Sequence, residues 1–158
     1  MANGKSGGVD MGLLVLRLAL GGIFIAHGVG KLLAPKGVQG FADFLASLSL
    51  PLVAGNLIYP LAVAVVSAEI GGGLLVILGL FARLGGLALA ILMAVAIWKV
   101  HFANGFFLPL EAKGPGPIAQ GYEYNVALLA MALCILLAGP GQIAFAPPRK
   151  GGKGDKPA

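Results

Sequence analysis

The chain has 158 residues, of which 58% are hydrophobic, 11% are charged and 26 are glycine. Soluble domains average about 25% charged residues and about 7% glycine, so this composition excludes a water-soluble globular domain and indicates an all-α membrane protein. The net charge of +5 comes with no basic helix or aromatic stacking platform, which excludes nucleic-acid binding, and the lone Cys134 excludes a disulfide framework and a cysteine-pair zinc site within one chain.

The first predicted span covers residues 11–33, an apolar stretch interrupted only by Arg17, His27 and Lys31. At about 1.5 Å per residue, a helix of this length crosses a hydrocarbon layer of about 30 Å. The stretch is too long for the core of a signal peptide, and no convincing small-residue cleavage site follows it. We therefore expect a retained transmembrane helix.

The connection that follows, residues 34–56, predicts a short amphipathic helix lying on the membrane interface. Its apolar side chains recur at helical spacing, at Val38, Phe41, Leu45 and Leu48. Polar residues alternate with them, which is the pattern of a helix with one face in lipid and one in water.

Residues 57–100 are apolar over about twice the length of one membrane crossing, so this stretch must fold back on itself. The break lies where glycines flank an arginine, which predicts a second span over residues 59–80 and a third over 83–100. A fourth span is predicted over residues 122–138, and it ends at a Gly-Pro-Gly sequence, a strong helix-end signal.

Four spans form one membrane domain over residues 1–146 and place both termini on the same side of the bilayer. Residues 147–158 contain four cations and no large apolar side chain, so a disordered basic tail is expected there. Six Lys and Arg on the terminal side against four opposite favour cytoplasmic termini. The second long connection, residues 101–121, is expected to cap the mouth of the bundle.

Small residues recur every four positions along each predicted span and predict tight packing in a four-helix bundle. These residues are Gly22, Ala26 and Gly30 in the first span; Ala64, Ala68 and Gly72 in the second; Gly86, Ala90 and Ala94 in the third; and Ala130, Cys134 and Ala138 in the fourth.

Two charges fall well inside the predicted spans, and each needs a partner or a role because a charge in hydrocarbon costs about 2.5–3.5 kcal/mol on insertion scales. Arg17 and Glu69 lie at depths about 7 Å apart in the four-span topology, which a long arginine side chain can bridge. We therefore expect an Arg17–Glu69 ion pair. It either fixes helix register only, or forms the polar floor of a cavity with Glu69 as a proton carrier.

A second polar group is expected near one membrane interface. His27 and Lys31 lie one turn apart on one face of the first span, and Lys99, His101 and Glu123 are predicted at the same level. The alternatives are interfacial snorkelling of the lysines and an interhelical hydrogen bond of His27. Two histidines do not favour a haem or a structural metal, so no metal ligand is assigned.

Such a cationic, hydrogen-bonding pocket suits a quinone headgroup or another small anionic or carbonyl-bearing ligand that arrives from the bilayer. The candidate ligand-binding residues are Arg17, His27, Lys31, Glu69, His101, Asn104, Gly105 and Glu123, with Asn104 and Gly105 shaping the loop over the pocket.

Several ordered motifs resemble the DoxX family of small membrane proteins over about residues 11–146. They are Leu16-Arg17-Leu18-Ala19-Leu20-Gly21, Phe24, His27-Gly28 and Lys31-Leu32; Glu69 with Gly71-Gly72; Leu78-Gly79-Leu80-Phe81-Ala82-Arg83; His101 with Asn104-Gly105-Phe106-Phe107; Gly121-Tyr122-Glu123-Tyr124; and Gly139-Pro140-Gly141. The resemblance implies a multi-pass, four-helix protein of the inner (plasma) membrane. The family is named for a subunit of a membrane oxidoreductase that passes electrons from sulfur compounds to quinone.

The sequence has no flavin motif, haem ligand set or cysteine pair, so we do not expect it to perform redox chemistry alone. The leading hypothesis is a quinone- or lipid-facing subunit of a membrane-associated oxidoreductase assembly, with no intrinsic cofactor, quinone as the candidate ligand and other subunits as partners. Two alternatives stay open, a non-catalytic scaffold that docks partner proteins and a small-solute or proton pathway. The oligomeric state is also open.

Overall fold

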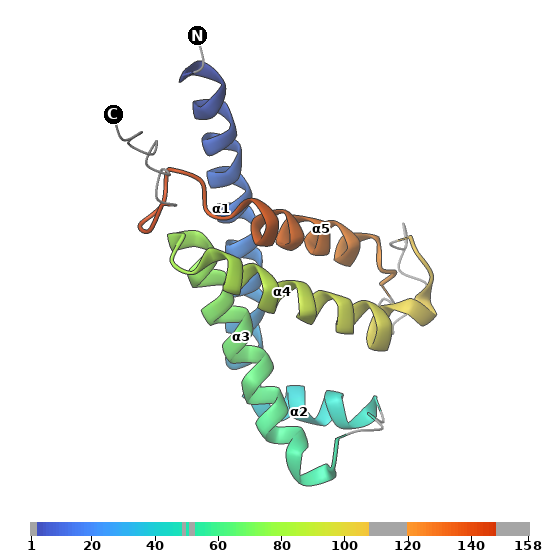
Figure 1. The fold of residues 1–158 in the computed structure, drawn as a ribbon. Helices are drawn as coiled ribbons and strands as arrows, with labels where there is room; N and C mark the ends of the chain where they lie inside the picture. The colour runs from blue at the N-terminus through green and yellow to red at the C-terminus, as the bar shows by residue number, and fades with distance from the viewer. Residues whose placement is uncertain (1–2, 49, 51–52, 108–119, 148–158) are drawn as a thin grey trace, which may run out of the picture.

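The computed structural model describes residues 3–48, 50, 53–107 and 120–147, and all regular structure in these ranges is helical (Figure 1). The main helices are α1 (Asn3–Leu33), α2 (Gly37–Ser47), α3 (Ile58–Leu78), α4 (Ala82–Ala96) and α5 (Glu123–Ala138). The short elements are the 3-10 turns η1 (Gly55–Leu57) and η3 (Phe102–Asn104) and the π-helical turn η2 (Ile97–His101), which continues α4. The predicted all-α fold, with a short helix between the first two long ones, is confirmed.

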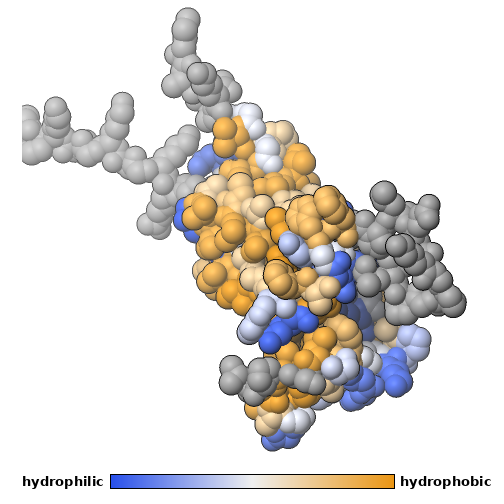
Figure 2. Space-filling model, turned by 90° about the vertical axis from the view of Figure 1, so that its right-hand side faces the viewer, coloured by the Kyte–Doolittle hydropathy of each residue, from blue (hydrophilic) through white to orange (hydrophobic). Residues whose placement is uncertain are grey.

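Among the described residues, three helical stretches are long and apolar enough to cross a membrane: Gly7–Leu33, Gly55–Leu78 and Ala82–Asn104. The fourth apolar helix, α5, occupies the predicted position but has 16 residues, so it is only about 24 Å long. Figure 2 shows a surface dominated by apolar side chains, with hydrophilic residues gathered toward the end where α2 and the start of α3 lie. This distribution fits helices that face lipid over most of their surface.

Helix α1 has 31 residues and begins well before the predicted start at residue 11. At about 1.5 Å per residue it is about 46 Å long. Its first turns project past the other helices (Figure 1). Arg17, and not residue 11, is level with the end of α3. The predicted tail, apart from Pro147, and most of the second connection lie outside the described residues.

Helices α1 and α3 pack through glycines that bring the two backbones into contact. A Cβ atom on Gly21 would lie 2.6 Å from the carbonyl oxygen of Gly73, and one on Gly73 would lie 2.8 Å from the carbonyl oxygen of Gly21. Further along, a Cβ on Gly28 would lie 2.6 Å from Cγ1 of Ile70. These contacts are closer than any side chain larger than hydrogen allows, so this interface depends on glycine.

The small-residue stripe predicted for the first span is therefore on the wrong face of the helix. A Cβ atom added to Gly22 or Gly30 would meet nothing within 4 Å, and Ala26 is exposed. One residue corresponds to a rotation of about 100° around a helix, so the adjacent Gly21 faces α3 while Gly22 faces lipid. Both positions are glycine, and spacing alone does not separate them.

The other stripes have mixed outcomes. Gly86 and Ala90 are buried between α4 and α5, as predicted, and a Cβ on Gly86 would lie 3.0 Å from the carbonyl oxygen of Ala132. Gly72 is also buried, against Leu89. The remaining predicted positions are exposed or partly exposed: Ala64, Ala68, Ala94, Ala130, Cys134 and Ala138. On α5 the buried face instead consists of Asn125, Leu128, Ala132 and Ile135.

The predicted break between the second and third spans is a tight turn around Gly79 and Phe81. Both residues adopt the left-handed conformation, with φ of 70° at Gly79 and 47° at Phe81. Gly79 ends α3, which is the usual role of a left-handed glycine. A Cβ on Gly79 would also lie 2.8 Å from Nη2 of Arg17, so this turn closes directly over the buried arginine.

Candidate functional site

A partly buried ion pair joins the end of α1 to the middle of α3. The Nζ atom of Lys31 lies 2.5 Å from Oε1 and 2.6 Å from Oε2 of Glu69. The side chain of Glu69 is 7% exposed and that of Lys31 is 24% exposed. Because Glu69 lies near the midpoint of α3, it is far from either end of a predicted spanning segment. An ionisable residue at such a depth is by default a candidate functional residue.

The sequence positions this pair through the glycine contacts of α1. Gly28 lies beside Glu69, since a Cβ on Gly28 would be 3.3 Å from the Cβ of Glu69. Lys31 follows three residues later on the same face of α1 and therefore reaches the carboxylate from one turn further along. Close approach of the two backbones is what brings the two charged groups within hydrogen-bonding distance.

Helix α2 lies over the ion pair. Its Phe41 ring centroid is 4.8 Å from Nζ of Lys31, within the range of a cation–π interaction. Ala42 and Leu45 are buried against Ala62 of α3, which holds α2 beside the first half of α3. The interfacial helix predicted from residues 34–56 thus contributes an aromatic ring to the site.

The outer face of α2 carries a small polar network. Asp43 accepts hydrogen bonds from Nε2 of Gln39 at 3.0 Å and from Nζ of Lys36 at 3.3 Å. These two interactions, the Gln39 hydrogen bond first, lower the pKa of the Asp43 carboxyl group below its ordinary value. Asp43 is therefore ionised at neutral pH, and the network stays on the exposed face of the helix.

The ion pair retains binding capacity. An ammonium group has three N–H donors, and Lys31 directs two of its contacts to Glu69. One donor is left for a ligand oxygen, and each carboxylate oxygen of Glu69 has a second lone pair. The site can thus donate a hydrogen bond to a carbonyl group and exchange a proton, next to the aromatic face of Phe41.

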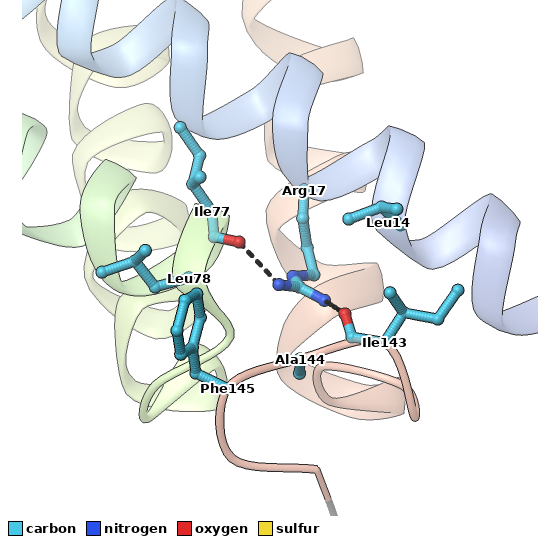
Figure 3. A pocket seen from close by; sticks show the side chains of 7 residues that line it. All are labelled: Leu14, Arg17, Ile77, Leu78, Ile143, Ala144 and Phe145. Atoms are coloured by element: carbon cyan, nitrogen blue, oxygen red, sulfur yellow. Dashed lines mark hydrogen bonds between the residues drawn. The ribbon is translucent and has the colours of Figure 1, made fainter.

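Arg17 does not take part in this pair, and the predicted Arg17–Glu69 ion pair is wrong. Its guanidinium donates to the carbonyl oxygens of Val76 at 2.8 Å and Ile77 at 2.6 Å in the last turn of α3. It also donates to the carbonyl oxygens of Pro140 at 2.8 Å and Ile143 at 2.7 Å after α5. Figure 3 shows the bonds to Ile77 and Ile143. Within the described residues its acceptors are all main-chain carbonyls.

The register of α1 against α3 explains this error. Arg17 lies level with the end of α3, where helix carbonyls have no partner of their own and carry partial negative charge. Glu69 lies beside Gly28, eleven residues further along α1 and so about 16 Å away. The prediction set residue 11 level with the end of the second span, whereas Arg17 itself is level with the last turn of α3, so the prediction placed Arg17 too close in depth to Glu69. Arg17, 1% exposed, caps α3 and fastens the segment after α5.

The predicted rim cluster is not brought together either. His27 is exposed, and its Nδ1 donates to the carbonyl oxygen of Ile23 at 2.9 Å within the same helix. His101 lies at the end of η2, well apart from the end of α1 in Figure 1. Lys99 lies over the ring of its neighbour Trp98, with Nζ at 3.7 Å from the centroid. Of the predicted residues, Lys31 and Glu69 form an ion pair.

Four predicted residues, namely His101, Asn104, Gly105 and Glu123, lie at the two ends of the second connection. Nδ1 of His101 and Nδ2 of Asn104 donate to the same carbonyl oxygen, that of Gln120, at 2.9 and 3.2 Å. Gly105 has φ of 79°, which suits glycine, and its carbonyl accepts the N–H of Tyr122 at 3.1 Å. The N–H of Glu123 donates to the carbonyl of Phe106 at 2.9 Å and starts α5. These contacts support the expectation that Asn104 and Gly105 shape this loop.

Sequence reasoning missed two contributors. The sequence pattern indicates Phe41 only as an apolar residue of the amphipathic helix, and no spacing rule shows that its ring lies over Lys31. The segment after α5 reads only as a helix end, although its carbonyls hold Arg17. A signal for the second was present, because a buried arginine without a carboxylate of matching depth needs carbonyl acceptors.

Comparisons with known proteins agree with this architecture. A family model described as DoxX matches residues 12–102, which is more than half of the chain. A curated protein of Bacillus subtilis (strain 168), named "Putative oxidoreductase CatD", is 28% identical over 138 residues that cover 87% of this chain and 87% of the relative. No solved structure matches the chain. The family match spans α1 to α4 and includes Lys31 and Glu69.

Proposed function

The chain belongs to the DoxX family of membrane proteins, and on that premise we propose that it is a quinone-facing subunit of a membrane-associated oxidoreductase assembly. The observation that carries the proposal is the Lys31–Glu69 pair at the middle of α3. The ring of Phe41, from the interfacial helix, contacts Lys31 of this pair. A relative named as an oxidoreductase supports the same class of activity.

The side chains at this pair fit a quinone headgroup. A bound quinone takes up two electrons and two protons to become a quinol. The remaining N–H of Lys31 suits a quinone carbonyl oxygen, and Glu69 is placed to hold and deliver a proton. The Phe41 ring offers an apolar face for the quinone ring to lie against. A partner subunit with a redox cofactor supplies or accepts the electrons.

Lateral access from the bilayer is part of this proposal. Lys31 is the more exposed member of the pair, with a side chain 24% accessible. A ligand therefore reaches Lys31 before it reaches Glu69. The exposed surface around it is rich in apolar residues, for example Val29 and Leu32. A hydrophobic ligand dissolved in lipid can therefore reach the pair without crossing water.

The membrane and its orientation follow from the same proposal. We place the protein in the plasma (inner) membrane with both termini in the cytoplasm, as the excess of Lys and Arg on the terminal side favours. The Lys31–Glu69 pair then faces the leaflet opposite the termini. Partner subunits dock on the loops of either side, and an oligomer of this chain is compatible with the arrangement.

The proposed roles of the other predicted residues are structural. Arg17 fastens the segment after α5 to the end of α3, and His101 and Asn104 fasten the second connection through Gln120. A proton pathway from Arg17 to Lys31 is less well supported, because Leu20 and Phe24 between them are 0% and 2% exposed and apolar. The scaffold function is also less well supported, because docking of partner proteins would not require a charged pair within the helices.

Photolabelling tests the proposed site. The full chain in lipid nanodiscs is irradiated with an azidoquinone, and the labelled peptides are identified by mass spectrometry. We expect saturable labelling of peptides from α1, α2 and α3 around Lys31, Phe41 and Glu69, suppressed by excess unlabelled quinone. Labelling that excess quinone does not suppress would contradict a quinone site and favour the scaffold function.

A further inference from the structure

An open hollow lies at the end of α3, beside the segment after α5, and is separate from the Lys31–Glu69 pair. It has a volume of about 340 Å³ and is walled by α1, the end of α3 and the segment after α5 (Figure 3). The lining residues are Leu14, Arg17, Ile77, Leu78, Ile143, Ala144 and Phe145. All but Arg17 are apolar, so the hollow combines one cation with a hydrophobic wall.

The cation in this hollow has no carboxylate partner in the part of the chain that the structure describes. Arg17 has five N–H donors, and four of them reach main-chain carbonyls. One N–H on Nη2 has no acceptor among those residues. Asp10, two turns earlier on α1, instead accepts the N–H of Gln142 through Oδ1 at 2.8 Å. Within the described ranges, the groups that accept hydrogen bonds from Arg17 are neutral main-chain carbonyls.

A second guanidinium lies on the other side of the same segment. Arg83, exposed in the first turn of α4, has its Nε and Nη2 atoms 3.2 and 3.4 Å from the position of a Cβ on Gly139. The carbonyl oxygen of the next residue, Pro140, accepts a hydrogen bond from Arg17. Arg83 donates no hydrogen bond within the described ranges. Two arginines thus flank Gly139 and Pro140, one buried and one exposed.

We propose that this end of the protein binds the phosphate group of an acidic phospholipid, with Arg83 as the direct ligand. A phosphodiester carries one negative charge and acceptor oxygens that match the planar fork of a guanidinium. Arg17, which is bonded to the carbonyl oxygen of Pro140, adds a second positive charge that attracts the phosphate. Basic pockets between membrane helices are known to hold anionic headgroups on the cytoplasmic side, which agrees with the proposed orientation.

The apolar wall selects a lipid over a free anion. Leu14 and Leu78 line the hollow, and Ile143 and Phe145 are 43% and 79% exposed beside it. An acyl chain attached to the bound phosphate buries part of this surface, whereas inorganic phosphate buries none of it. The expected occupant is therefore a phospholipid of the leaflet on the terminal side, and not phosphate from solution.

Native mass spectrometry of the full chain released from maltoside micelles tests this inference. Phosphatidylglycerol, phosphatidylcholine and inorganic phosphate are each offered to the wild type and to Arg83→Gln, Arg83→Lys and Lys99→Gln. Lys99 is the matched control, because it is a cation near the far end of α4 that lies over Trp98. We expect retention of phosphatidylglycerol over phosphatidylcholine, and a loss of about fivefold in Arg83→Gln with partial rescue in Arg83→Lys.

Three results would overturn the proposal. Equal retention of phosphatidylglycerol by Arg83→Gln and the wild type would exclude Arg83 as the ligand. Equal retention of phosphatidylcholine would exclude recognition of the net charge. Displacement of the lipid by millimolar inorganic phosphate would assign the site to a free anion. None of these results bears on quinone binding at Lys31 and Glu69, at the other end of the helices.

Discussion

The ammonium group of Lys31 contacts both carboxylate oxygens of Glu69, at 2.5 and 2.6 Å, and so links the last turn of α1 to the middle of α3. The pair lies beside Gly28, where the two helix backbones approach closely, and beneath Phe41 of α2. Three of the five main helices therefore meet at one pair of opposite charges, which makes the pair both a structural link and the candidate site.

Removing one member of the pair is expected to destabilise the protein strongly. Lys31→Met leaves an unpaired carboxylate in a site where Glu69 is 7% exposed, and such a change typically costs about 3–5 kcal/mol. Lys31→Met combined with Glu69→Gln leaves no charge behind, so the double variant should lose less than the sum of the two single losses. Unfolding in mixed micelles, followed by Trp98 fluorescence, measures this coupling. Additive losses would contradict a direct ion pair.

Adjacent glycines of α1 should respond in opposite ways to the same substitution. Gly21→Ala places a methyl group 2.6 Å from the carbonyl oxygen of Gly73 and should cost about 1–3 kcal/mol through forced separation of α1 and α3. Gly22→Ala meets nothing within 4 Å and should be neutral or stabilising by up to about 1 kcal/mol. The same unfolding assay compares them. Equal effects at both positions would refute the register of α1 against α3.

Arg17 should control the segment after α5 and not the ion pair. Arg17→Gln removes most of the hydrogen bonds to Val76, Ile77, Pro140 and Ile143, so this segment should detach from the end of α3. Hydrogen exchange of the Phe145 amide, which donates to Leu78 at 3.0 Å, should accelerate. Exchange in α2 is the internal control and should not change. Unaltered exchange at Phe145 would show that Arg17 does not hold the segment.

The polar network on α2 predicts a pH dependence. The pKa of Asp43 is lowered from its ordinary value of 3.8. The network therefore stabilises α2 fully at a pH above 3.8, and this stabilisation is lost as the pH falls through the lowered pKa of Asp43. Gln39→Leu removes the main cause and should move the pKa of Asp43 back up. A pH titration followed by carbon-13 NMR of the Asp43 carboxyl group measures this pKa. The control variant Ser47→Ala should leave the pKa of Asp43 unchanged. An unchanged pKa would exclude Gln39 as the cause.

Helix positions could be predicted from this sequence because long apolar runs and glycine-rich breaks determine them directly. The break at Gly79 and the end of α5 at Gly139 are examples, since both residues have positive φ. The contact faces could not be predicted, because glycines are adjacent at Gly21 and Gly22 and a rotation of one residue exchanges them. Most helix faces are apolar in a membrane protein, so hydrophobicity does not decide between them.

The site could be predicted only in part, for a related reason. Lys31 and Glu69 both stand out as candidates, since they are charges within apolar spans. Their pairing depends on which residues of α1 lie level with α3, and the lengths of the apolar runs do not determine how far α1 extends past the end of α3. The predicted register placed Arg17 too close in depth to Glu69, so it gave Glu69 the wrong partner. Apolar length gives the approximate depth of each charge but not the register between two helices.

The most direct test of the central claim is the affinity of the purified full chain for a short-chain quinone analogue in nanodiscs. We predict saturable binding that weakens at least about tenfold in both Glu69→Gln and Lys31→Met, since each loses a charge-assisted hydrogen bond. His27→Ala should bind as the wild type does, because the His27 ring is bonded to the carbonyl oxygen of Ile23 within its own helix and not to Lys31 or Glu69. Binding that is indifferent to Glu69 and Lys31, or that depends on His27 instead, would contradict the account.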